Sequence, residues 1–185
     1  LEGINGIRNL EGIQVVGEAP GAEAQKSQAA AIIFQTEVDR FFQHEETLTQ
    51  EVFGPSSVVL KCQAKEEMLR FAKAMEGSLS ATVHGTEEDL KENRDLLDIL
   101  ETRTGRVIYN GFPTGLEVCT AMHHGGPYPA ATHSFFTSVG TNAIYRFVRP
   151  VCYQDLPQFA LPPELQDSNP LGVHRMLNAE WTAPK

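Results

Sequence analysis

Two short stretches of this chain place polar and aromatic side chains where they could take part in chemistry. Residues 51–55 read Glu-Val-Phe-Gly-Pro, and residues 110–115 read Asn-Gly-Phe-Pro-Thr-Gly. Because the residue before proline is driven out of the α region, both stretches are expected to be stiff and non-helical. Such segments offer a carboxylate or an aromatic ring to a small molecule. Taken alone, however, turns of this kind are more often simple connections between elements.

The cysteines and histidines give a weaker signal. Cys119 and His123 are four residues apart and two more histidines follow them. A metal site needs nitrogen and sulfur donors that converge, and this spacing matches no ligand motif. A Cys–His nucleophilic pair is equally weak, and Cys62 and Cys152 suit small buried hydrophobic positions. We therefore expect no metal site and assign no catalytic residue.

A regular alternation of strands and helices surrounds these stretches. Apolar runs predict strands at residues 57–62, 79–84 and 106–109. Between them, helical spacing predicts one helix at residues 65–76 and a second from a capping box at residues 86–89 to about residue 105. Strand–helix–strand units of this kind predict a parallel sheet with right-handed crossovers. Residues 110–115 then follow the last strand, at the end where such sheets bind ligands.

The N-terminal part is less regular. Strands are expected at residues 13–16 and 29–36, the second continuous in its apolar pattern and therefore buried. Residues 18–27 are expected to form a loop, and residues 37–49 a short helix or a wandering loop. The predicted fold class is α/β, with an open, mainly parallel sheet and flanking helices.

Composition narrows the function classes. The chain has 185 residues, which suits one domain, and its formal net charge is −9. An acidic balance argues against a nucleic-acid partner and against an anionic membrane surface. Three cysteines without paired spacing indicate a reducing compartment, so we expect a cytoplasmic protein. Because the chain begins at Leu1 rather than at methionine, we expect it to be a piece of a longer protein.

The C-terminal residues differ in composition from the rest. Residues 150–185 are rich in proline and show no regular pattern, and a short helix at residues 141–149 precedes them. We expect one domain at residues 1–149, followed by an irregular tail at residues 150–185 that wraps the surface or meets a neighbouring subunit.

Residues 51–55 resemble the Glu-x-Phe-Gly-Pro signature of the aldehyde dehydrogenase superfamily. Four later blocks, at residues 110–119, 124–132, 137–141 and 146–155, together resemble one branch of it. That branch contains the 2-oxoglutarate semialdehyde dehydrogenases and the NADP-dependent fatty aldehyde dehydrogenases. The resemblance covers most of the chain and is strongest from Glu51 to Asp155.

The resemblance implies oxidation of an aldehyde to an acid with NADP, or NAD, through a cysteine thioester. It implies that Glu51 hydrogen-bonds the nicotinamide ribose and that Phe53 packs beside the nicotinamide. It also makes residues 110–115 a substrate-side loop, in which Phe112, Pro113 and Thr114 are expected to line the aldehyde pocket.

The departures from the family pattern matter as much. The family's nucleophile lies in a Gly-Gln-x-Cys context, and neither this context nor the general-base block occurs here. The dinucleotide-binding part is also absent. The resemblance therefore implies the C-terminal portion of a catalytic domain that is inactive alone, whose partners are an aldehyde, the rest of the parent chain and further copies of it. The alternative is a non-catalytic binding or assembly module.

Overall fold

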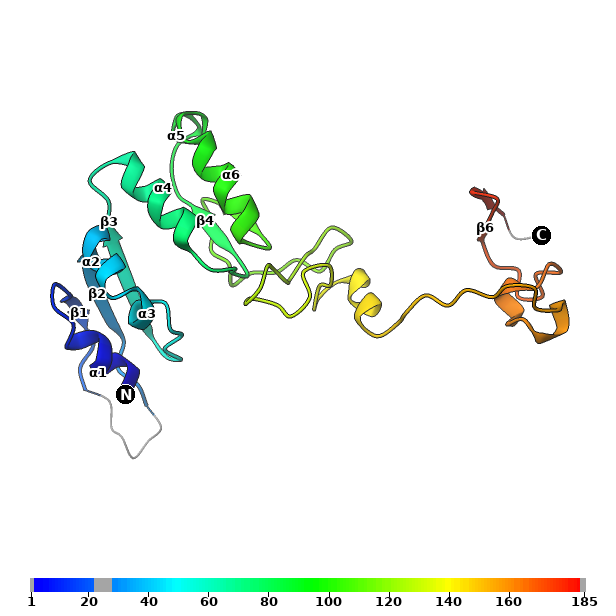
Figure 1. The fold of residues 1–185 in the computed structure, drawn as a ribbon, viewed down its shortest axis with the longest axis horizontal. Coiled ribbons are helices and arrows are strands. Elements are labelled where there is room, and N and C mark those ends of the chain that lie inside the picture. Colours follow the sequence, from blue (N-terminus) through cyan, green and yellow to red (C-terminus); the bar gives the residue numbers. More distant parts are fainter. Residues whose placement is uncertain (1, 22–27, 184–185) are drawn as a thin grey trace. The chain divides into compact units, whose positions relative to one another are not determined.

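The structure, a computed structural model, describes residues 2–21 and 28–183 (Figure 1). The chain divides into two units, Leu1–Arg146 and Phe147–Lys185. Within the part of the chain that is described, no helix is long and apolar enough to cross a membrane. The first unit contains α1 (Glu2–Arg8), β1 (Gln14–Glu18), β2 (Ile32–Glu37), α2 (Val38–Gln43), α3 (Glu45–Leu48), β3 (Ser56–Lys61), α4 (Lys65–Ala74), β4 (Ala81–Val83), α5 (Glu87–Glu92), α6 (Arg94–Arg103), β5 (Val107–Tyr109) and a 3-10 helix at Thr141–Arg146.

The first sheet has the strand order β1-β2-β3, in which β2 pairs antiparallel with β1 and parallel with β3. Burial along β2 alternates: Ile32, Phe34 and Thr36 are buried, whereas Ile33 is 44% exposed. This strand, expected to be buried, therefore packs one face against a hydrophobic core, while Ile33 on its other face is exposed. Of the loop expected at residues 18–27, residues 22–27 lie outside the described residues.

The second sheet consists of β4 and β5, which pair in parallel and share no ladder with β3. The single sheet expected to join all three strands is thus divided in two, although the α/β class and the parallel pairing are present. Each of these two strands has three residues, and one isolated bridge between Ser78 and Thr104 extends their pairing. Strands of three residues lie at the short end of the usual range.

The expected long helix after residue 86 is two helices, α5 and α6, with Asn93 between them. The Asn93 amide Nδ2 donates to the Asp89 carbonyl at 2.8 Å, and its backbone leaves the helical conformation with φ −117° and ψ 36°. Asparagine favours such breaks because its amide competes for backbone hydrogen bonds. The capping box expected at residues 86–89 is present. Figure 1 shows α6 lying beside α4, and the two helices pack together.

A glycine-rich contact fixes the long loop after β5 against the second sheet. A Cβ on Gly105 would collide with the carbonyl oxygen of Gly125, and one on Gly126 would lie 2.6 Å from the Ser78 oxygen. Both Gly125 and Gly126 are buried. Backbone approaches this close require residues without a side chain. The loop therefore returns to the amino ends of β4 and β5, beside Ser78 and Gly105.

Within its described residues, 147–183, the second unit contains two short 3-10 helices, at Gln158–Ala160 and Pro163–Leu165, and a hairpin of β6 (Arg175–Leu177) and β7 (Glu180–Thr182). Asn178 and Ala179 form the hairpin turn with φ values of 50° and 68°, as two-residue hairpin turns require. The tail, expected to be irregular, thus contains six residues in two short strands. Its large apolar side chains, among them Phe159 and Trp181, are mostly exposed.

Candidate functional site

Residues 51–55 present two side chains to solvent because the residue between them faces inward. Val52 packs against the buried cluster that contains Ile32 and Phe34, and its Cγ2 atom approaches Gly3 of α1 so closely that a Cβ there would lie 2.9 Å away. In extended backbone the neighbours of an inward residue point outward. Glu51 is accordingly exposed and Phe53 is 95% exposed. The inward valine thus fixes the direction of both predicted cofactor-binding side chains.

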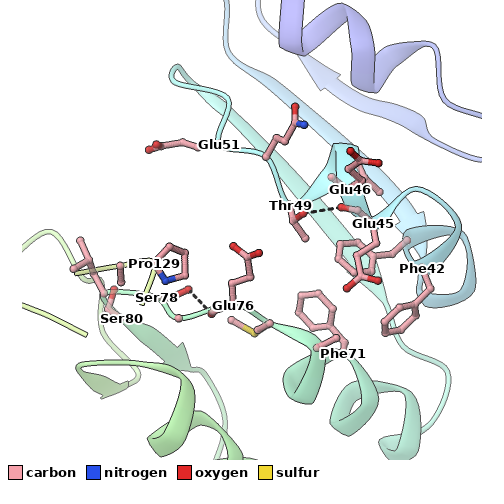
Figure 2. A pocket seen from close by; sticks show the side chains of 18 of the residues that line it. Phe42, Glu45, Glu46, Thr49, Glu51, Phe71, Glu76, Ser78, Ser80 and Pro129 are labelled. Atoms are coloured by element: carbon pink, nitrogen blue, oxygen red, sulfur yellow. Dashed lines mark hydrogen bonds between the residues drawn. The ribbon is translucent and has the colours of Figure 1, made fainter. Parts of the chain in front are cut away.

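Glu51 lines a hollow of about 1440 Å³ in the first unit, which we call the acidic hollow (Figure 2). Four glutamates line it, and no lysine or arginine is among the described residues that do so. Figure 2 shows Glu51 and Glu76 extending from opposite sides of this space, with the Phe42 and Phe71 rings along another wall. Phe53 does not line the hollow. The described residues that line the acidic hollow are Phe41, Phe42, Gln43, Glu45, Glu46, Leu48, Thr49, Gln50, Glu51, Phe71, Ala74, Met75, Glu76, Gly77, Ser78, Leu79, Ser80, Pro129 and Ala130.

The walls of the acidic hollow are held together by contacts between α2 and α4. The Phe41 and Phe71 rings meet edge to face with centroids 5.1 Å apart. The Arg70 guanidinium lies over the Phe42 ring at 3.9 Å and also pairs with Asp39, whose Oδ1 is 2.9 Å from Nη1. Aromatic and cation–π contacts of this kind stabilise packing beyond burial alone. These contacts position the aromatic wall that faces the glutamates.

The loop after β5 begins with a tightly held asparagine. Asn110 has φ 48°, and its side-chain amide binds both backbone groups of Gly85: Oδ1 accepts from the N–H at 2.9 Å and Nδ2 donates to the carbonyl at 2.8 Å. The Tyr109 hydroxyl donates to the same carbonyl at 2.9 Å. Phe112, 79% exposed, then lies beside His84 with ring centroids 5.7 Å apart. Phe112 therefore stands at the carboxyl ends of β4 and β5, as expected from the topology.

Pro113 and Thr114 lie elsewhere, in a second hollow of about 220 Å³ that we call the basic hollow. Its described lining residues are Leu79, Ser80, Arg106, Pro113, Thr114, His123 and His124. Because Ser80 precedes β4 and Arg106 precedes β5, this hollow lies at the amino ends of the two strands. The loop folds back along the short strands, and the Arg106 Nη2 atom donates to the Pro113 carbonyl at 2.6 Å.

The three residues predicted to line one aldehyde pocket are thus divided, since Pro113 and Thr114 line the basic hollow and Phe112 does not. Sequence reasoning considered these histidines only as metal ligands or as partners of a nucleophilic cysteine. The sequence signal that could have indicated their place is the pair His123-His124 directly before two glycines. The close packing of Gly125 and Gly126 fixes the backbone next to these histidines.

The cysteines do not form a site in the described part of the chain. All three are exposed and free, and no group of three or more His, Cys, Asp or Glu side chains among the described residues could hold a metal ion. Although Cys62 is exposed, partial desolvation of its thiol raises the pKa, and the nearby carboxylates of Glu67 and Glu37 raise it further. A raised pKa disfavours the thiolate, so Cys62 is poorly suited to act as a nucleophile.

Comparison with known sequences identifies proteins that are homologous to this chain. The chain is 42% identical over 170 residues, 92% of its length, to Alpha-ketoglutaric semialdehyde dehydrogenase 2 of Azospirillum brasilense. It is 41% identical over 98% of its length to Alpha-ketoglutaric semialdehyde dehydrogenase of Acinetobacter baylyi. The chain is an aldehyde dehydrogenase homologue. It spans about a third of the length of these curated relatives, 32% and 34% respectively. No protein-family model matches it.

Solved structures of aldehyde dehydrogenases share its fold. A salicylaldehyde dehydrogenase from Pseudomonas putida, complexed with salicylaldehyde, superposes on 83% of this homologue with a TM-score of 0.57 and 23% identity, and 30% of that chain is covered. Betaine aldehyde dehydrogenase from Staphylococcus aureus superposes on 79% with a TM-score of 0.53 and 15% identity, with 27% of that chain covered. A variant of the same enzyme has been solved in complex with NAD⁺. These likenesses confirm the α/β fold class.

Proposed function

We propose that this homologue forms part of an NAD(P)-dependent aldehyde dehydrogenase that oxidises a short oxo-acid aldehyde, of the class of 2-oxoglutarate semialdehyde, to the acid. The observation that carries the proposal is the 42% identity, sustained over 92% of the chain, with a protein named for that substrate. Localisation in the cytoplasm and assembly into a homo-oligomer belong to the same proposal.

Glu51 and Phe53 are the residues of this chain that suit the nicotinamide end of the cofactor. An ionised carboxylate accepts from two neighbouring hydroxyls, as a ribose offers, and Glu51 is exposed with no hydrogen-bond partner among the described residues. An aromatic ring left 95% exposed on a stiff segment suits a flat partner. The cofactor, when bound, supplies hydride-accepting chemistry.

The acidic hollow limits which part of a dinucleotide would lie near Glu51. Its described lining carries four carboxylates and no basic side chain, so a pyrophosphate would be repelled there. The neutral ribose and the nicotinamide ring, which is a cation in the oxidised cofactor, suit this surface better. We assign no residue of this chain as the nucleophile or the general base, because the Gly-Gln-x-Cys context is absent from its 185 residues.

A chimera tests the proposal. This sequence replaces the matching third of the Azospirillum protein, and aldehyde-dependent formation of NADH or NADPH is measured with 2-oxoglutarate semialdehyde. We expect turnover by the chimera and none by the 185-residue chain alone. A folded chimera that binds the cofactor but never turns over the aldehyde would favour a non-catalytic module instead.

The variant Glu51→Gln in the chimera tests the cofactor assignment. Losing one charge-assisted hydrogen bond costs roughly 1.5–3 kcal/mol, so the single-turnover hydride transfer should slow by about tenfold to a hundredfold. Glu76→Gln, which removes a charge from the opposite side of the acidic hollow, is the control. Equal slowing by both variants would indicate a general electrostatic effect and contradict a specific contact with Glu51.

A further inference from the structure

We propose that the basic hollow is the subsite that binds the distal carboxylate of an oxo-acid substrate, with Arg106 as the residue that selects for it. This inference rests on the proposed function and adds the group on the substrate that this chain recognises. It starts from the contrast between the two hollows: four glutamates line one, whereas an arginine and two histidines line the other.

The charge of the basic hollow is unusual for this protein. The chain carries 24 acidic and 15 basic residues, yet no described residue lining this hollow is acidic. Other arginines of the first unit, such as Arg8, Arg70 and Arg94, form ion pairs with carboxylates. In the described part of the chain Arg106 forms none, and the one hydrogen bond of its side chain goes to the Pro113 carbonyl. A half-buried guanidinium without an acidic partner is suited to bind an anion.

The Arg106 guanidinium still has donors to offer. Only Nη2 is used within the described structure, which leaves Nε and Nη1 for a ligand. The bond to Pro113 also fixes the orientation of the guanidinium plane, and a fixed plane favours paired hydrogen bonds to both oxygens of a carboxylate.

His124 is held in place by its neighbours. Its Nδ1 atom lies 3.1 Å from the Ser138 hydroxyl, and its backbone N–H donates to the buried Thr137 hydroxyl at 2.8 Å. The Nε2 atom has no hydrogen-bond partner among the described residues, so it remains free for a ligand oxygen. Ser80 and Thr114 add hydroxyl groups to the same lining.

The size and the apolar wall of the basic hollow favour a short acid. Leu79 and Pro113 supply apolar surface next to the polar groups, which suits a carboxylate attached to a few methylenes. A volume of about 220 Å³ lies below the roughly 300–1,000 Å³ of sites for drug-sized ligands. The hollow therefore fits the end of a five-carbon oxo acid better than the chain of a fatty aldehyde.

Binding to the ¹⁵N-labelled 185-residue chain tests the inference without any turnover. Pentanoate and pentanamide have the same shape and differ in charge, and the shifts of the Ser80, Arg106 and Thr114 amides report on the hollow. Because a charge-assisted pair is worth more than tenfold in affinity, we expect pentanoate to bind at least about tenfold more tightly than pentanamide. Equal affinities would overturn the proposal, and so would inorganic phosphate binding as tightly as pentanoate.

Arg103 provides the matched control. Its Nη2 atom also donates to a backbone carbonyl, that of Lys73, at 2.7 Å, but it does not line the basic hollow. Arg106→Gln should abolish the preference for pentanoate, and Arg103→Gln should leave it intact. Equal effects of the two variants would overturn the assignment to Arg106. The amide spectrum checks that each variant folds, and the wild-type acid-to-amide ratio decides the proposal should Arg106→Gln unfold.

The chimera separates this inference from the proposed function. There Arg106→Gln should raise KM for 2-oxoglutarate semialdehyde at least about tenfold and leave KM for pentanal unchanged. An active chimera whose two KM values rise together would overturn the carboxylate subsite and leave the dehydrogenase assignment standing. An inactive chimera with intact pentanoate binding would overturn the dehydrogenase assignment alone.

Discussion

The side chain of Asn110 closes a pair of hydrogen bonds with the backbone of Gly85, the N–H at 2.9 Å and the carbonyl at 2.8 Å. The contact continues the parallel pairing of β4 and β5 by one further step, because Asn110 follows β5 and Gly85 lies just after β4. It joins the two strands at the end where Phe112 stands. The loop after β5 thus begins at a residue with left-handed backbone, which its own side-chain amide holds in place.

Replacing Asn110 separates its two roles. Asn110→Gly keeps the backbone free to adopt φ 48° and loses both side-chain hydrogen bonds, whereas Asn110→Ala also strains the backbone. We expect Asn110→Gly to lower the free energy of unfolding by about 1–2 kcal/mol, and Asn110→Ala to lower it by about 1 kcal/mol more. Urea denaturation of the three proteins measures both steps. Equal loss in the two variants would mean that the backbone strain is negligible.

Gly105 is the position where an added methyl group should do most damage. Its Cβ would overlap the carbonyl of Gly125, so the loop must move away from the second sheet. We expect Gly105→Ala to cost about 1–3 kcal/mol in the free energy of unfolding, as overpacking generally does. Gly115→Ala is the control, because nothing lies within 4 Å of a Cβ there. Similar stabilities of the two variants would show that the close approach is not needed.

Asp89 should give the capping box of α5 an acid-sensitive stability. The backbone N–H of Thr86, and after it the Thr86 hydroxyl, hold the pKa of Asp89 below its ordinary value. A group whose folded pKa is lowered stabilises the fold above its unfolded pKa, about 3.9 for aspartate, and this contribution is lost as the pH falls through the folded pKa. The melting temperature of wild type should therefore exceed that of Asp89→Asn near neutral pH, and the difference should shrink below about pH 4.

Glu87→Gln serves as the control for this experiment. It removes a charge from the same first turn of α5 without touching the bonds between Thr86 and Asp89. A difference between wild type and Asp89→Asn that stays constant from neutral to acid pH would contradict the capping role.

Phe112 distinguishes a pocket wall from a scaffold residue. Because its ring is 79% exposed and lies beside His84, Phe112→Ala should change the melting temperature little. In the chimera we expect it to shift kcat/KM between a short and a long aldehyde by about 1–3 kcal/mol, the size of an apolar pocket contact. A constant ratio of the two substrates combined with a lower melting temperature would assign Phe112 to the scaffold.

Several local features could be predicted because they depend on neighbours in the chain. The helix beginning at Lys65 and the strands β3, β4 and β5 lie within two residues of their expected bounds, since apolar spacing and capping residues act over one or two turns. The break at Asn93 was missed because the pattern of leucines continues through it, while its amide bonds back to Asp89. The exposure of Glu51 and Phe53 also follows from a local alternation around Val52.

The sequence by itself determined the α/β class, the alternation of strands and helices between Ser56 and Tyr109, the two stretches with candidate binding side chains and the likeness to aldehyde dehydrogenases. Only the tertiary structure decided how the strands divide between sheets, and that Phe112 parts from Pro113 and Thr114. It alone placed Arg106 with His123 and His124. The physical reason is that these arrangements depend on close approaches between distant backbones, as at Gly105 and Gly125, which no local period or propensity encodes.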